Sequence, residues 1–138
     1  MLIRKANIQD IDSCVMLLRM PEFAFASGEY PDHDYLIEYV NAGLFYVAVV
    51  DNDIVGCIYG EFLKSNTALL WYALVREDYR GRGIGTLLVS RFEEECNKKG
   101  IKWIVLYAPQ NSINTIEFYE ELGYNKGNAY YEFNKRIL

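Results

Sequence analysis

Histidine and cysteine, the residues that most often build metal centres, are scarce in this sequence. It has one histidine, His33, and three widely spaced cysteines, Cys14, Cys57 and Cys96. No Cys-x-x-Cys pair and no Cys/His cluster occurs, so we expect no metal site. A Ser-His-Asp triad is also disfavoured, because the single histidine stands apart. Each cysteine falls in an apolar periodic segment, which favours a reduced core residue over a nucleophile.

Long apolar runs and excess positive charge are missing as well. No stretch approaches the roughly 18 uncharged apolar residues that a membrane helix needs, and the first five residues do not resemble a signal peptide. The formal net charge is -5 and the pI is about 4.9, so no basic face is expected for nucleic acid. We therefore expect a soluble, cytoplasmic protein without nucleic-acid or membrane partners. The acidity would suit a cationic substrate, but solubility alone explains it more simply.

Linkers, repeats and low-complexity segments are also absent. No Pro/Gly/Ser-rich stretch divides the 138 residues. Hydrophobic residues make up 51% of the chain and aromatic residues 15%, which is ample for a packed core. We therefore predict that residues 1–138 form a single domain.

The order of apolar patterns predicts an α/β fold. The expected elements are a strand at 2–6, a helix between 7 and 21, a helix at 32–42, a hairpin of strands 44–50 and 54–63, a strand at 68–75, a helix from 84 to Gly100, a strand at 103–107, a helix at 112–122 and a last strand near 130–136. The hairpin should be antiparallel, whereas the strand–helix–strand unit should pair its two strands in parallel. The prediction is a mixed central sheet with helices on both faces, in the order β-α-α-β-β-β-α-β-α-β.

The strongest single feature is the run Arg80-Gly81-Arg82-Gly83-Ile84-Gly85-Thr86, between a strand and a helix. Glycine permits positive φ and lets a ligand approach the main chain closely. The first turn of a helix leaves about four N–H groups unpaired, and together with the helix dipole they form an anion site. The two arginines add fixed positive charge that suits phosphate oxygens. The run therefore predicts a phosphate-binding loop.

The spacing of the glycines separates this loop from two common nucleotide motifs. No Lys-Ser/Thr pair follows the last glycine, so the Walker pattern is absent. The glycines at 81, 83 and 85 read Gly-x-Gly-x-Gly, whereas the dinucleotide fingerprint requires Gly-x-Gly-x-x-Gly. A purely structural alternative is a tight strand-to-helix turn with surface arginines.

The pattern Arg80-x-x-Gly83-x-Gly85, after a strand and a tyrosine, resembles motif A of the GNAT superfamily of N-acetyltransferases. A second segment, Phe118-Tyr119-Glu120-Glu121-Leu122-Gly123-Tyr124, resembles the Phe-Tyr-Glu-x-Leu-Gly-Phe box of the same superfamily. The two motifs occur in the expected order, and the order of elements fits nearly the whole chain. The resemblance implies an enzyme that passes the acetyl group of acetyl-CoA to an amine.

The resemblance also implies how acetyl-CoA is held. In GNAT proteins the strands before and after the motif A helix splay apart, the pantetheine arm pairs with the backbone of the earlier strand, and the pyrophosphate rests on the loop amides. Many members carry a cofactor-contacting Asn where this chain has Ser112, and Asn111 or Asn114 would replace it. The implied cofactor-binding residues are Ala73, Leu74, Val75, Arg80, Gly81, Arg82, Gly83, Ile84, Gly85, Thr86, Asn111 and Asn114.

Transfer of an acetyl group to an amine needs a group that protonates the departing thiolate and a group that takes the proton of the amine. By resemblance, Tyr119 is the general acid, although its apolar neighbours also suit a core aromatic. Glu61 is the first candidate for the base, with a solvent-facing strand residue as the alternative. Positions that carry a catalytic Glu in some members match Thr67 and Tyr107, which are not carboxylates. Water is a further candidate for the base.

Three functions therefore stay open at the level of the sequence. The first is an N-acetyltransferase acting on a small-molecule amine or a peptide or protein amino group. The second is a binding module that senses acyl-CoA without turnover, which the missing carboxylates favour and the presence of Tyr119 argues against. The third is an α/β domain with an unrelated anion site. The oligomeric state is open as well, a homodimer included.

Overall fold

The computed structural model describes all of residues 1–138 and divides the chain into two compact units, Met1–Leu106 and Tyr107–Leu138. The first unit contains β1 Leu2–Lys5, η1 Ile8–Asp10, α1 Ile11–Leu17, η2 Pro21–Phe23, α2 His33–Ala42, β2 Phe45–Val50, β3 Asp53–Leu63, β4 Thr67–Val75, η3 Glu77–Tyr79, α3 Ile84–Lys98 and β5 Trp103–Val105. The second unit contains one helix, α4 Ile113–Glu121. None of the helices has the length and apolar character that crossing a bilayer requires.

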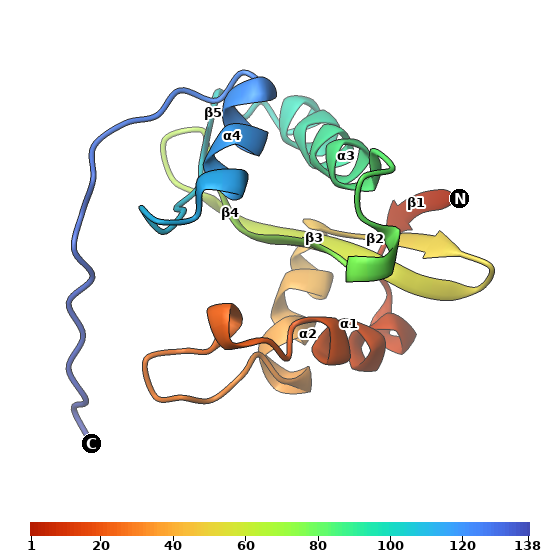
Figure 1. The fold of residues 1–138 in the computed structure, drawn as a ribbon, viewed down its shortest axis with the longest axis horizontal. Helices are drawn as coiled ribbons and strands as arrows, with labels where there is room; N and C mark the ends of the chain where they lie inside the picture. The colour runs from red at the N-terminus through yellow and green to blue at the C-terminus, as the bar shows by residue number, and fades with distance from the viewer. The chain divides into compact units, whose positions relative to one another are not determined.

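The first unit is built on a mixed sheet, as predicted, and this sheet has five strands. Its strands follow the order β1-β2-β3-β4-β5, and every neighbouring pair is antiparallel except β4 and β5, which are parallel. Figure 1 shows α1 and α2 on one face of the sheet and α3 on the other. The strand–helix–strand unit around α3 therefore has the parallel connection that the sequence indicated.

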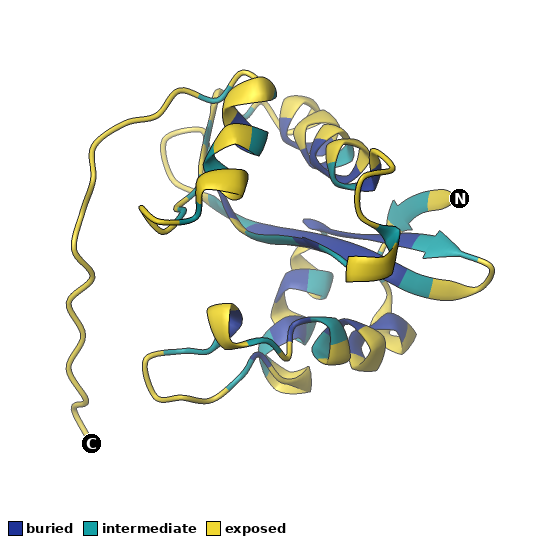
Figure 2. Cartoon of the chain, in the orientation of Figure 1, coloured by how far each residue is buried: buried dark blue, intermediate teal, exposed yellow.

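The sheet is buried from both sides, which explains the apolar runs in the central strands. Figure 2 shows β2 and β3 dark along most of their length, while each covering helix is buried on one side only. Side chains on the α1/α2 face form one core cluster with Ile11, Leu18 and Leu36 of the helices. Neighbouring side chains of a strand point to opposite faces of the sheet. The strand residues that alternate with those of this cluster therefore face α3.

The three cysteines have the structural role expected of them. Cys14, Cys57 and Cys96 are buried and form no disulfide. A hydrogen bond with Cys57, followed by burial, raises the pKa of the Cys14 thiol well above its usual range. Burial likewise raises the pKa of Cys96 to about 12. Thiols held in this protonated state are poor nucleophiles.

Close packing between β3, β4 and α3 depends on a glycine in β3. A methyl group on Gly60 would overlap the Leu69 carbonyl oxygen and would lie 2.8 Å from Cζ of Phe92. The backbone oxygen cannot move without shifting the β3–β4 ladder. Gly60 is therefore required by the contact between the sheet and α3.

We expect Gly60→Ala to lower the free energy of unfolding by about 3 kcal/mol, the upper end of ordinary overpacking costs. For a domain of this size, thermal denaturation should show a melting temperature lower by about 10 °C. Gly127→Ala is the matched control, because a methyl group there meets no atom within 4 Å. Equal melting temperatures for the two variants would contradict this account of the packing.

The predicted last strand, Tyr130–Arg136, is wrong. Residues 125–138 adopt no regular secondary structure, remain exposed, and pair with no strand. The aromatic-rich sequence has the propensity of a strand, but a strand is stabilised by a hydrogen-bonded partner, which propensity does not supply. The strand expected at 103–107 is also shorter, because β5 ends at Val105.

Candidate functional site

The predicted phosphate loop joins the end of β4 to the start of α3. Gly81 and Gly83 have φ angles of 75° and 81°, in the left-handed region that favours glycine. Gly83 is the residue that precedes α3, and no side chain caps this end of the helix. The first turn of α3 also contains no acidic residue. The N–H groups at the start of α3 therefore remain available to an anion.

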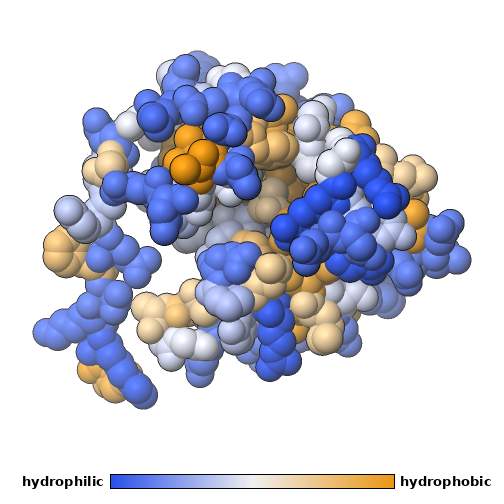
Figure 3. Space-filling view, viewed as in Figure 1, coloured by the Kyte–Doolittle hydropathy of each residue, from blue (hydrophilic) through white to orange (hydrophobic).

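Tyr79 organises the arginines around this loop. The guanidinium carbons of Arg76 and Arg82 each lie 4.8 Å from the centre of the Tyr79 ring. Arg82 also donates a hydrogen bond to the Asp78 carbonyl at 3.2 Å, and Nε of Arg80 donates to the Val75 carbonyl at 2.8 Å. Arg80 and Arg82 are exposed, and Figure 3 shows a strongly hydrophilic patch over η3 and the loop. The structure thus holds two arginines beside the helix start by contacts within the loop.

The part played by Tyr79 was not predicted from the sequence. This residue precedes the loop, and no function was expected of it. The available signal was its spacing, because arginines stand three residues before and three residues after it. Stacking of guanidinium groups on an aromatic ring is a common arrangement.

β4 and β5 pair only over a short stretch, which leaves part of β4 with a free edge. The parallel ladder joins Thr67, Ala68 and Leu69 to residues 103–105 and then stops. Ala73, Leu74 and Val75 pair with β3 on their other edge and have no strand partner on this one. Backbone groups of alternate residues on an unpaired edge can bind an extended ligand. The three predicted pantetheine-binding residues therefore lie where such a ligand would be received.

A β-bulge marks the place where β4 leaves β5. Tyr59 pairs with Tyr72 and Gly60 pairs with Leu70, so Trp71 has no partner in the β3–β4 ladder. Bulges increase the local twist of a strand and re-aim its side chains, and they are common beside active sites. The bulge lies between the paired beginning of β4 and its unpaired end.

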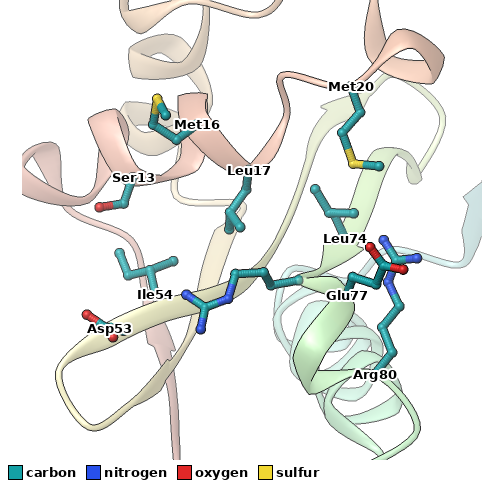
Figure 4. A pocket seen from close by; sticks show the side chains of 10 residues that line it. Ser13, Met16, Leu17, Met20, Asp53, Ile54, Leu74, Glu77 and Arg80 are labelled. Atoms are coloured by element: carbon teal, nitrogen blue, oxygen red, sulfur yellow. The ribbon is translucent and has the colours of Figure 1, made fainter.

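A groove of about 500 Å³ runs between α1, the start of β3 and the end of β4. Figure 4 shows Leu17, Met20 and Leu74 facing it, with Glu77 and Arg80 at one rim. The groove shares only Leu74 and Arg80 with the predicted cofactor residues, and Glu61 does not line it. It therefore borders the phosphate loop without coinciding with the predicted site.

Glu61 lies in β3, on the sheet face covered by α1 and α2. It is partly exposed and pairs with Leu69 of β4. Gly60, the preceding residue, faces Phe92 of α3, so Tyr59 and Glu61 both point to the opposite face. The structure thus gives Glu61 partial access to solvent beside the buried ring of Tyr59.

The Phe118–Tyr124 box forms the end of α4 in the second unit. Tyr124 N–H donates to the Tyr119 carbonyl, Gly123 N–H donates to the Glu120 carbonyl, and Gly123 has a φ of 93°. These two bonds with a left-handed glycine form a Schellman motif. The rings of Tyr119 and Tyr124 meet at 5.4 Å, which supplies the apolar contact that often accompanies it. Much of the box therefore encodes a helix stop.

Tyr119 is 9% exposed, and burial raises the pKa of its phenol to about 12. It therefore keeps its proton at neutral pH, as a general acid must. Asn111 and Asn114 are exposed at the other end of α4, where the side chain of Ser112 does not cap the helix. These three predicted site residues belong to the second unit, while the other predicted residues belong to the first.

A comparison with protein families supports the resemblance noted in the sequence. The model described as "Acetyltransferase (GNAT) family" matches residues 13–124, which is most of the chain. The chain belongs to the GNAT acetyltransferase family. The match extends from α1 through the phosphate loop to the end of the Phe118–Tyr124 box.

Curated GNAT relatives include two bacterial acetyltransferases. An acetyltransferase of Sodalis glossinidius is 34% identical over 95 residues, which cover 69% of this chain and 66% of that protein. An acetyltransferase of Photorhabdus laumondii is 33% identical over 96 residues, with the same two coverages. The chain therefore spans slightly less than two thirds of the length of these relatives.

Solved GNAT structures share the fold. An N-acetyltransferase from Thermoplasma acidophilum in complex with coenzyme A matches with a TM-score of 0.72, 24% identity and 87% coverage of both chains. An aminoglycoside acetyltransferase from an uncultured soil metagenomic sample, in complex with sisomicin, matches with a TM-score of 0.78 and 18% identity, covering 98% of this chain and 96% of the other. At identities below 25%, these similarities show only that the fold is shared.

Proposed function

We propose that this protein is an N-acetyltransferase that transfers the acetyl group of acetyl-CoA to a primary amine, either of a small molecule or of a peptide or protein. The observation that supports this most strongly is the uncapped start of α3, flanked by Gly81, Gly83 and two exposed arginines, in a chain of the GNAT family. In this proposal residues 1–138 act as one domain in the cytoplasm, and a homodimer stays open.

The loop and β4 together suit a CoA thioester. The N–H groups of Gly83 to Thr86 and the guanidinium groups of Arg80 and Arg82 bind the pyrophosphate, because each contributes a donor or positive charge. The free edge of Ala73–Val75 binds the amide groups of the pantetheine arm through the backbone. Asn111 or Asn114 adds a polar contact at the start of α4. No carboxylate in the first turn of α3 opposes the phosphate charge.

Tyr119 supplies the proton that the leaving group needs. The neutral amine nitrogen bonds to the thioester carbon, the carbon–sulfur bond breaks, and the phenol gives its proton to the departing thiolate. A backbone N–H near Val75 stabilises the negative charge on the carbonyl oxygen. The high pKa of Tyr119 keeps it protonated until the thiolate forms.

The base that takes the proton from the amine is either Glu61 or water. Glu61 is partly exposed and is therefore able to exchange protons with solvent. Water replaces it if most of the rate comes from positioning of the two substrates. The alternative function is an acyl-CoA-binding module without turnover, which the absence of carboxylates at Thr67 and Tyr107 favours.

Two measurements separate these functions. Calorimetric titration with acetyl-CoA should give one binding event per chain, which a domain with an unrelated anion site would not give. Thiol release from acetyl-CoA in the presence of a panel of amines should then depend on the amine. Binding without amine-dependent thiol release would favour the sensing module.

The reaction is expected to need no metal ion. Nowhere in residues 1–138 do three or more His, Cys, Asp or Glu side chains gather in a way that could hold a metal ion. The proposed chemistry uses only proton transfer and backbone donors. Incubation with a chelator, followed by dialysis, should leave the rate of thiol release unchanged. Loss of activity that a divalent ion restores would show that this prediction is wrong.

A further inference from the structure

Charge is unevenly distributed along the chain. Between Arg19 and Lys64 there is no Lys or Arg, while the same stretch contains eight carboxylates. They are Glu22, Glu29, Asp32, Asp34, Glu38, Asp51, Asp53 and Glu61. Asp51 lies in the β2–β3 turn and Asp53 begins β3, while the other six belong to η2, the loop that follows it, α2 and the far part of β3. Positive side chains gather instead around the loop that enters α3. The two substrates of the proposed reaction would therefore meet regions of opposite charge.

A set of aromatic rings from η2, α2, β3 and β4 lies in contact on one face of the sheet. The ring centre of Tyr59 lies 4.9 Å from that of Tyr39, 5.9 Å from that of Tyr72 and 6.2 Å from that of Tyr35. Phe23 of η2 meets Tyr72 at 4.7 Å. We call these five residues the aromatic set. Faces of such rings attract cations, and their apolar edges accept aliphatic chains.

One hydroxyl in the aromatic set lacks a hydrogen-bond partner. Tyr59 is completely buried, and its Oη makes no hydrogen bond of good geometry, although burial and the neighbouring Tyr35 hydroxyl raise its pKa. Nearby, Tyr39 Oη donates to Tyr35 Oη at 3.3 Å. A buried hydroxyl without a partner is unfavourable. Tyr59 thus offers one unused hydrogen bond inside the aromatic set, which is an independent sign of a polar ligand there.

Two of the carboxylates lie beside the aromatic set. Burial raises the pKa of Tyr39 above its usual range, and the charges of Glu61 and Glu38 add to this effect. Glu61 projects from the same strand and face as Tyr59. Glu38 is exposed on α2. Acidic groups, ring faces and an unpaired hydroxyl therefore occur together.

We propose that the acceptor is a small aliphatic amine with two or more amino groups, of which one reacts and another remains an ammonium held by Glu38, Glu61 and the aromatic set. This inference rests on the proposed acetyltransferase function and narrows its substrate class. The reacting nitrogen must be neutral, so the attraction has to act on the second nitrogen. The methylene chain between them packs against the rings, and Tyr59 Oη accepts an N–H bond.

The matched substrates are butylamine and putrescine, which have the same carbon chain and one or two amino groups. We expect kcat/KM for putrescine to exceed that for butylamine about tenfold at low salt, which one partly exposed ion pair and one cation–π contact would supply. The ratio should fall as ionic strength rises, because salt screens exposed charges. Equal values for the two amines, with clear turnover of both, would overturn the inference and leave the acetyltransferase function standing.

Variants of the carboxylates test where the second nitrogen lies. Glu38→Gln should raise KM for putrescine several-fold and leave KM for butylamine unchanged, whereas Glu94→Gln, exposed on α3 across the sheet, should change neither. Glu61→Gln should act like Glu38→Gln on KM, and if Glu61 is also the base it should lower kcat for both amines alike. Identical effects of Glu38→Gln and Glu94→Gln would contradict the assignment.

Tyr59→Phe separates a ligand contact from a packing role. We expect a higher KM for putrescine, an unchanged KM for acetyl-CoA and little loss of thermal stability, because the hydroxyl makes no hydrogen bond of good geometry to the protein. A lower melting temperature with an unchanged KM for putrescine would show that the hydroxyl is structural.

Direct binding decides the inference even without turnover. Calorimetry of the full chain with putrescine and with butylamine should show tighter binding of putrescine. If neither amine is acetylated and acetyl-CoA does not bind, the acetyltransferase function fails. The same titration still tests the charge inference, which equal or absent binding of the two amines overturns.

Discussion

Replacing Gly83 with aspartate is expected to abolish measurable binding of acetyl-CoA while leaving the protein folded. Gly83 precedes the first residue of α3, where the pyrophosphate would meet the uncapped N–H groups. A carboxylate at this position would accept those N–H bonds itself and repel the phosphate charge. Calorimetric titration with acetyl-CoA measures the effect, and we expect no detectable heat of binding.

The variant should still fold, with a modest loss of stability. A side chain on Gly83 meets no atom within 4 Å, so it fits without a clash. The φ of 81° costs energy for any other residue, but Asp and Asn tolerate it better than most and are preferred at helix starts. Gly83→Asn is the matched control without charge and should retain part of the affinity. Unchanged affinity in a folded Gly83→Asp variant would exclude the loop as the binding site.

Tyr119→Phe is expected to lower kcat about a hundredfold with little change in KM for acetyl-CoA. Phenylalanine has nearly the same volume and keeps the contacts with Phe118 and Tyr124 that support the end of α4. Only the proton is lost, and general acids typically contribute at least about 10²-fold. Because the transition state alone uses this proton, the loss should appear in kcat. Steady-state kinetics at saturating acetyl-CoA measure it.

The pH profile gives a second test of the same role. The pKa of Tyr119 is raised to about 12, so the wild-type enzyme should not lose activity through this residue between about pH 7 and 10. Tyr119→Phe should approach the wild-type rate at high pH, because above the ordinary thiol pKa of about 8.5 the departing thiolate no longer needs a proton. Full activity of Tyr119→Phe across this range would show that Tyr119 is only a core aromatic.

Local chemistry made part of this structure predictable. The glycines at 81, 83 and 85 indicated positive φ at the strand-to-helix turn; Gly81 and Gly83 have it, whereas Gly85 lies within α3. Asp32 was predicted as the start of the second helix, and its side chain accepts the Tyr35 N–H at 2.9 Å. Gly43 and Gly123 were predicted to end helices, and both lie in the left-handed region. Each of these features depends on a few neighbouring residues, so sequence patterns specify it.

Features that depend on distant residues were not predictable in the same way. The bulge at Trp71 and the early end of the β4–β5 ladder arise from pairing between strands. The rings of the aromatic set come from η2, α2, β3 and β4, so no short sequence motif predicts their contact. The predicted strand at 130–136 was wrong, because these residues have no neighbouring strand with which to pair. The roles of Glu61, Asn111, Asn114 and Tyr119 remain predictions, since they require a bound substrate.

The most direct test of an N-acetyltransferase is the mass of its product. The full chain is incubated with putrescine and acetyl-CoA that carries deuterium in the acetyl group, and the amine is analysed by mass spectrometry. The proposed function predicts an amine heavier by one labelled acetyl group, in an amount equal to the free CoA released. Release of CoA with unlabelled amine and labelled acetate, for putrescine and for every other amine in the panel, would contradict it.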